Sequence, residues 1–235
     1  MLKNPNNPLS LGKEPPQPMD SYPATYTDVH GTEATVITND GETLCITIRG
    51  VEFKGSDFDL LEPCDDATPD QLKGFSLNQN ELCSCRIECA IPILISDRGN
   101  PSQGTLTVDL ILGDPGPRGS LNRQELQITL ACDHGEYAGS GKSGWFEDEL
   151  LEIQAKLPDG VFMQACINCL YSDYSPCGHG TFGGMMCFRN LKTAYLKVKS
   201  KADFWSIHNR YDRIVQETYV CPEFKRRIPG TGYRG

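Results

Sequence analysis

The sequence lacks a long hydrophobic run. Its longest apolar stretch lies around residues 90–95 and is far too short to cross a bilayer. The first 23 residues, MLKNPNNPLSLGKEPPQPMDSYP, contain no apolar segment of the kind that secretory signal peptides carry. We therefore expect neither export nor a membrane partner.

The sequence also lacks a recognisable catalytic constellation. It has only four histidines, and His30, His134 and His208 each stand apart from other candidate groups. Cys177 and His179 are two residues apart in a Gly-rich stretch, where they rarely reach the geometry of a nucleophile and its base. The acidic residues are too many for a catalytic pair to be singled out. The sequence therefore favours a protein that is not an enzyme, with no catalytic or cofactor-binding residue to name.

One stretch, GEYAGSGKSGW, superficially resembles a phosphate-binding loop. In the P-loop pattern four residues separate a first glycine from Gly-Lys-Ser, but here the position of that first glycine holds Glu136, and Gly135 is one residue out of register. The helix expected next opens with three acidic residues at 147–149, which would repel phosphate. We interpret the stretch as a flexible loop.

Cysteine, in contrast, is abundant. Eleven cysteines without an export signal indicate a reducing compartment, hence the cytoplasm, where thiols serve as metal ligands or as small buried hydrophobes. The odd number of cysteines also argues against a complete disulfide framework.

The segment CINCLYSDYSPCGHGTFGGMMCFRN opens with a C-x2-C pair, a spacing that lets two thiolates hold one ion. We predict one structural zinc per chain. Its preferred ligands are Cys166, Cys169, Cys187 and Cys221, and the alternates are Cys177 and His179 in the loop between them. Free or buried thiols are the second interpretation. Redox chemistry is less favoured, because this C-x2-C pair opens no helix.

A second cluster, CSCRIEC, contains Cys83, Cys85 and Cys89 with Ile87 between them. On a strand these odd positions share one face, and free cysteine packs as a small hydrophobe. We expect a core stripe. The alternative is a second metal site, which would need distant partners such as Cys64, or Cys132 with His134.

The first half of the chain is predicted to be β structure. The run EATVITNDGETLCITIRGVEF contains Asn39-Asp40-Gly41, which is typical of a hairpin turn, and TLTVDLIL alternates apolar and polar residues as a half-buried strand does. Five to seven such strands predict an antiparallel sandwich or a strongly curved sheet.

From residue 145 the pattern becomes mixed. WFEDELLEIQAKL is expected to be a helix, whereas GVFMQAC, TAYLKVKS and RIVQETYVC are expected to be strands. Ser200 with Asp203 predicts the start of another helix. The fold class is therefore α+β, with a flexible or partner-wrapped arm at 1–21, a β-rich, sandwich-like portion at 22–144 and a smaller, zinc-stabilised α/β portion at 145–235.

The net charge of −9 is unevenly distributed. Residues 1–165 carry 11 Lys and Arg against 26 Asp and Glu, whereas residues 166–235 carry 11 against 5. The basic part either docks on the acidic part of its own chain, which we favour because its charges are dispersed, or faces an anionic partner such as nucleic acid.

The segments CLYSDYSPCGHGTFGGMMCFRN, VQETYVCPEF and RRIPGTGYRG resemble an uncharacterised bacterial family, a domain of unknown function. The resemblance covers roughly the last 70 residues well and the first half poorly. It implies a bacterial origin and no activity, and its Cys-x2-Cys, Cys-Phe-Arg and Cys-Pro elements correspond to Cys166, Cys169, Cys187 and Cys221.

Together these features predict a non-enzymatic binding or assembly protein of the bacterial cytoplasm. Its partner would be another protein, and an inhibitor of a basic toxin or effector is one version of this function. The alternatives are a nucleic-acid-binding zinc module formed by residues 189–227, with nucleic acid the less favoured partner, and a zinc-dependent hydrolase.

Overall fold

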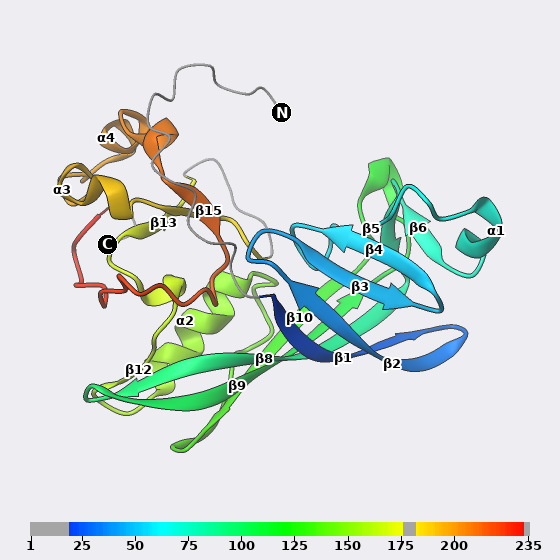
Figure 1. Ribbon diagram of the computed structural model, residues 1–235, viewed down its shortest axis with the longest axis horizontal. Coiled ribbons are helices and arrows are strands. Elements are labelled where there is room, and N and C mark those ends of the chain that lie inside the picture. Colours follow the sequence, from blue (N-terminus) through cyan, green and yellow to red (C-terminus); the bar gives the residue numbers. More distant parts are fainter. Residues whose placement is uncertain (1–18, 176–181, 233–235) are drawn as a thin grey trace.

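The computed structural model describes residues 19–175 and 182–232. Within these ranges ten antiparallel strands form one large sheet (Figure 1) in the order β11-β10-β9-β8-β1-β2-β3-β4-β5, with β12 also paired to β8. Its strands are β1 (Asp20–Asp28), β2 (Gly31–Asn39), β3 (Leu44–Ile48), β4 (Val51–Gly55), β5 (Glu62–Pro63), β8 (Cys85–Asp97), β9 (Asn100–Leu112), β10 (Gln124–Cys132), β11 (Gly135–Ala138) and β12 (Val161–Met163).

The other described elements are short, apart from one helix. Two small sheets pair β6 (Ser76–Asn78) with β7 (Glu81–Cys83), and β14 (Met185–Cys187) with both β13 (Ser172–Tyr174) and β15 (Arg213–Val215). The α-helices are α1 (Pro69–Leu72), α2 (Phe146–Lys156), α3 (Lys192–Tyr195) and α4 (Lys201–Trp205). No described helix is long and apolar enough to span a membrane. The predicted β-rich α+β fold class is confirmed.

The predicted hairpin at Asn39-Asp40-Gly41 joins β2 to β3. The Asp40 carboxylate accepts the backbone N–H groups of Glu42 (3.0 Å) and Thr43 (2.7 Å), while Gly41 takes a positive φ of 89°. A second turn at Arg49-Gly50, with both residues at positive φ, splits the following run into β3 and β4. The sequence predicted only the hairpin at Asn39-Asp40-Gly41 in this region and not this second turn, because arginine rarely adopts a positive φ.

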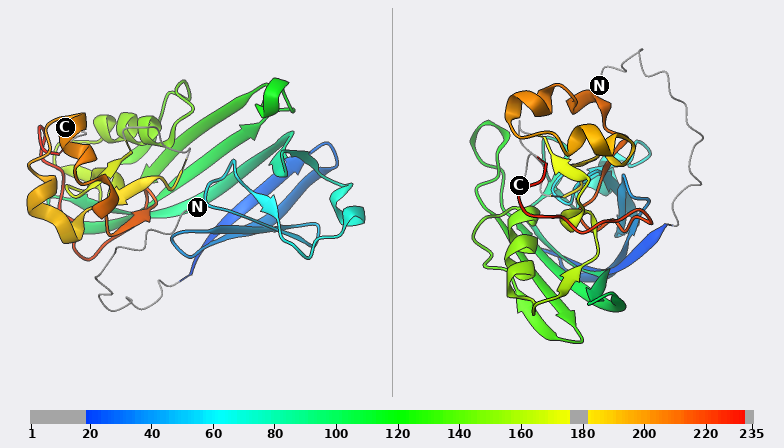
Figure 2. Two further views of the ribbon diagram at one scale, coloured as in Figure 1. Left: turned by 90° about the horizontal axis from the view of Figure 1, so that it is seen from above. Right: turned by 90° about the vertical axis from the view of Figure 1, so that its left-hand side faces the viewer.

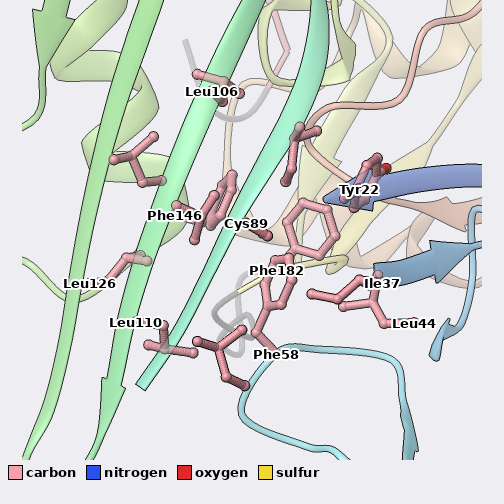
Figure 3. Packing of buried hydrophobic residues seen from close by; sticks show 14 of the residues in the cluster. Tyr22, Ile37, Leu44, Phe58, Cys89, Leu106, Leu110, Leu126, Phe146 and Phe182 are labelled. Atoms are coloured by element: carbon pink, nitrogen blue, oxygen red, sulfur yellow. The ribbon is translucent and has the colours of Figure 1, made fainter. Parts of the chain in front are cut away.

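The large sheet curves round a common core. Leu106, Leu110 and Leu112 on β9 are at most 1% exposed, as the alternation predicted. Figure 3 shows residues of β9 and β10 facing residues of β2 and β3 across the rings of Phe58 and Phe182. The strands therefore form one continuous sheet in place of the two facing sheets of a sandwich, because β1 pairs with both β2 and β8.

Helix α2 covers part of this core. Its buried face carries Phe146, Leu150 and Ile153 and packs on β10 and β11. The left view of Figure 2 shows α2 lying along the sheet, beside the C-terminal segments that gather at the same end of the molecule. The predicted helix is thus confirmed.

The CSCRIEC cluster is core, as expected. Cys85, Ile87 and Cys89 share the buried face of β8. Cys83 is also buried but belongs to β7, because Ser84 takes a positive φ of 50° and interrupts the strand.

The C-terminal part has its own small core, in which Phe188, Tyr195 and Phe204 pack together. The predicted cap is present, with Ser200 Oγ accepting the N–H of Asp203 at 3.2 Å. Two predictions were wrong. TAYLKVKS forms α3 and a turn instead of a strand, because Tyr195 and Val198, three residues apart, both enter this core.

The second error concerns RIVQETYVC, of which only residues 213–215 form a strand. Beyond Val215 the chain uses the side chains of Gln216 and Glu217 for buried polar contacts, and the N–H of Tyr219 bonds back to the carbonyl of Gln216 (3.2 Å) in a turn. GVFMQAC does contain the predicted strand, β12.

Two adjacent leucines test how α2 packs. Leu150 is fully buried, whereas Leu151 is 39% exposed. We expect Leu150→Ala to lower the free energy of unfolding by about 2–5 kcal/mol, and Leu151→Ala to change it by less than about 1 kcal/mol. Urea unfolding measures both values, and equal losses would contradict the packing of α2.

Candidate functional site

The four preferred cysteines converge from separate parts of the chain. Cys166 is the first residue of a 3-10 turn after β12, and Cys169 directly follows that turn. Cys187 ends β14, and Cys221 lies in the chain beyond β15. Their exposures are 2%, 6%, 6% and 6%, and every described cysteine is a free thiol. The alternates Cys177 and His179 lie outside the described residues.

Backbone hydrogen bonds bring these segments together. The N–H of Cys166 donates to the carbonyl of Tyr219 (2.9 Å), and that of Ile167 donates to the carbonyl of Glu217 (2.9 Å). The carbonyl of Cys187 accepts the N–H of Asp212 (2.8 Å). The C-x2-C turn is thereby held against the segment that leads to Cys221.

Electrostatic interactions between the thiols indicate that they lie near one another. Burial raises the pKa of Cys166 well above its ordinary value, and the nearby Cys169, Cys187 and Cys221 raise it further. Burial likewise raises the pKa of Cys187 to about 11, with Cys221 and Cys169 among the further causes. The sulfurs of Cys166 and Cys187 would therefore resist ionising alone, because a thiolate at either position is desolvated and faces other thiolates.

Other groups at the site favour thiolates. The N–H of Glu223 donates to the Cys221 sulfur at 3.4 Å, and the N–H of Arg189 donates to the Cys187 sulfur. The positive charges of Arg213 and Arg189 partly oppose the rise in the pKa of Cys166 and Cys187, respectively. Such donors and cations are what a cluster of ionised sulfurs needs in place of water.

The sulfurs do not already form a closed cage. Within the described ranges, no group of three or more His, Cys, Asp or Glu side chains has the geometry to hold a metal ion. The arrangement thus consists of four buried, neighbouring thiols with hydrogen-bond donors and positive charge around them.

The cluster also joins two hydrophobic cores. Cys166 and Cys187 pack in the core of the large sheet, whereas Cys169 packs with Phe188 and Tyr195 in the C-terminal core. Any bond through the four sulfurs would tie these cores together.

Two buried carboxylates nearby were missed by sequence interpretation. The Asp57 carboxylate accepts the N–H of Phe182 at 2.8 Å, and that of Glu217 accepts the N–H of Gly183 at 2.7 Å and the hydroxyl of Tyr174 at 2.8 Å. Burial raises the pKa of both carboxyl groups. Both carboxylates hold the backbone of the segment that leads into β14, an arrangement called the Asp57 clamp below. The sequence did not predict it, because no sequence pattern links residues so far apart.

In the loop that resembles a phosphate-binding loop, carboxylates of helix α2 already accept the backbone N–H groups that would bind a phosphate. Glu149, fully buried on α2, accepts the N–H of Gly141 at 2.9 Å, and Glu152 accepts the N–H of Ser140 at 2.8 Å. Because two carboxylates already occupy these donors, an anion would be repelled there, as the sequence indicated.

Comparisons with known proteins identify the family. The chain belongs to a family of unknown function (DUF6304), whose model matches residues 20–172. Membership of an uncharacterised family was predicted, but the matched residues are mainly the β-rich portion and end before Cys187 and Cys221. No curated protein and no solved structure matched the chain.

The Asp57 clamp predicts a pH dependence of stability. Burial, reinforced by the nearby Asp59, raises the Asp57 pKa to about 8, above the value near 3.9 that is typical of an unfolded chain. The contribution of the protonated Asp57 side chain to the free energy of unfolding is therefore complete below about pH 4 and is lost as the pH rises through about 8. We expect Asp57→Asn to reduce the fall in stability between these values, because asparagine stays neutral and still accepts the N–H of Phe182.

Urea midpoints at several pH values measure this effect. The exposed Asp66 provides the control, since Asp66→Asn should leave the pH profile as in the unmodified protein. A D57N profile as steep as that of D66N would refute the assignment.

Proposed function

We propose that this protein is a non-enzymatic binding or assembly protein of the bacterial cytoplasm, stabilised by one structural zinc bound to Cys166, Cys169, Cys187 and Cys221. The observation that carries the proposal is the convergence of these four buried thiols between two hydrophobic cores.

Zinc suits this set better than another cation would. Soft thiolate ligands favour zinc over magnesium or calcium, and structural zinc sites use four protein ligands. Four thiolates round Zn²⁺ leave two negative charges, which the nearby Arg213 and, in part, Arg189 (also paired with Asp212) would offset. The N–H groups that donate to Cys187 and Cys221 would orient those sulfurs.

If the metal is only structural, the partner must be bound by the protein surface. With four cysteine ligands no position remains for a metal-bound water, so the set does not support a hydrolase. Within the basic half, Arg189 pairs with Asp212 at 2.7 Å. Residues 1–165 carry 26 Asp and Glu against 11 Lys and Arg, and this excess of negative charge supports a basic protein partner.

Metal content tests the zinc site. Protein purified without chelator should carry about one zinc per chain by elemental analysis. Cys166→Ser and Cys221→Ser should each abolish zinc binding and lower the melting temperature, because the joint between the cores opens. Cys132→Ser, at a half-buried cysteine outside the set, and Cys177→Ser should keep the metal.

Two outcomes would overturn the assignment. Less than about 0.2 equivalents of zinc in the unmodified protein would exclude a structural site. Loss of zinc in Cys177→Ser but not in Cys221→Ser would mean that the alternate ligands bind it.

The binding role is tested by affinity purification followed by mass spectrometry. We expect one protein partner with a basic surface, whose recovery falls as salt rises because the attraction is electrostatic. Purified nucleic acid added in competition should not displace it. Recovery of nucleic acid alone, with strong salt dependence, would support a nucleic-acid-binding module instead.

A further inference from the structure

The large sheet contains a fork next to β8. On one side β8 pairs with β9 over its whole length. On the other side it pairs with β1 only up to Cys89 and with β12 only from Ile95. Between these points no described strand pairs with that edge of β8 (compare β1, β8 and β12 in Figure 1). A pocket of about 340 Å³ opens there.

The pocket floor is a buried polar network. Asn39 Nδ2 donates to Tyr22 Oη at 2.6 Å and to Gln216 Oε1 at 2.5 Å, and Gln216 Nε2 donates back to Asn39 Oδ1 at 2.8 Å. Asn39 Oδ1 also accepts the N–H of Gly41 at 2.9 Å. The hydrogen-bonding capacity of Asn39 is thereby used in full.

Tyr22 is different. Its hydroxyl accepts from Asn39, but none of the described residues accepts its proton, although the side chain is only 3% exposed. A buried donor usually has a partner, in the protein or in a bound molecule. Because Tyr22 lines the pocket, its proton is available to a ligand there.

The remaining lining restricts the ligand. Among the described residues that line the pocket there is no lysine, arginine or histidine, and the one carboxyl group, that of Asp20, has a pKa raised by burial. An anion would therefore meet no positive charge. Gln103, Gln216 and Thr218 add amide and hydroxyl groups, which both donate and accept hydrogen bonds.

A peptide strand does not suit the fork. The carbonyl of Leu94 accepts the N–H of Gln164 on this side of β8, and backbone groups two residues apart in a strand point the same way. Pro92 therefore faces the fork and offers no N–H, which blocks the addition of a strand.

We propose that this fork pocket binds a small, neutral, hydroxyl-rich molecule of the monosaccharide class. Tyr22 would donate to a sugar oxygen, and the free N–H of the Gln216 amide and the Thr218 hydroxyl would bind neighbouring hydroxyls. Pro92, Ile93 and Val220 line the same pocket and would contact the C–H groups of the ring. This inference goes beyond the proposed function and does not depend on zinc.

The test is saturation-transfer difference NMR of the full chain with glucose, galactose, mannose, N-acetylglucosamine and myo-inositol. Dissociation constants of any that bind are measured by titration calorimetry. Tyr22→Phe removes only the hydroxyl and should weaken binding about tenfold, the effect of one lost hydrogen bond. The matched control is Tyr137→Phe, whose hydroxyl donates to the carbonyl of His134 outside the pocket, and it should bind as the unmodified protein does.

Should Tyr22→Phe fail to fold, Gln103→Ala replaces it, because Gln103 is exposed at the pocket wall and takes no part in the floor network. The proposal is overturned if no compound of the panel binds, or if the pocket variant binds as tightly as Y137F. It is also overturned if succinate or putrescine, added as charged probes, binds in place of the sugars.

Discussion

The pairing of β8 is the constraint on which the rest of the structure depends. This strand shares thirteen residues with β9 on one side and divides its other side between β1 and β12. Because the pairing of β8 with β1 ends at Cys89, the sheet can curve round the core, and a pocket opens beside residues 92–94 of β8. Because β12 takes over at Ile95, the chain is delivered to Cys166 at the edge of the same sheet.

Much of the β-rich half could be predicted from sequence, because its signals are local. The alternation of β9 and the Asp40-Gly41 turn each depend on neighbouring residues alone. The errors occurred where tertiary contacts override local preference. Tyr195 and Val198 are compatible with a strand but turn into a core made by Phe188 and Phe204, and Glu217 leaves its strand to bind Tyr174.

The proximity of the four candidate cysteines could be expected only in part. Cys166 and Cys169 follow β12 and Cys187 ends β14, whereas Cys221 lies beyond β15 and outside any strand. The surrounding groups were not predictable. Arg213 and Asp57 act on residues about 50 and 125 positions away, and a single sequence carries no signal that links such distant partners. The same holds for the pocket, whose Asn39 and Gln216 are separated by 177 residues.

The position of the cysteines explains why cysteine, and not another hydrophobe, would be used there. The C-terminal core is small, and its helices α3 and α4 span only four and five residues. Helices of this length are not stable alone, and a small core buries too little surface to hold them firmly. Apolar residues at the joint would add only area, whereas four thiolates on one ion would fix three chain segments at once. The proposed zinc would thus let so small a core keep a defined position on the large sheet.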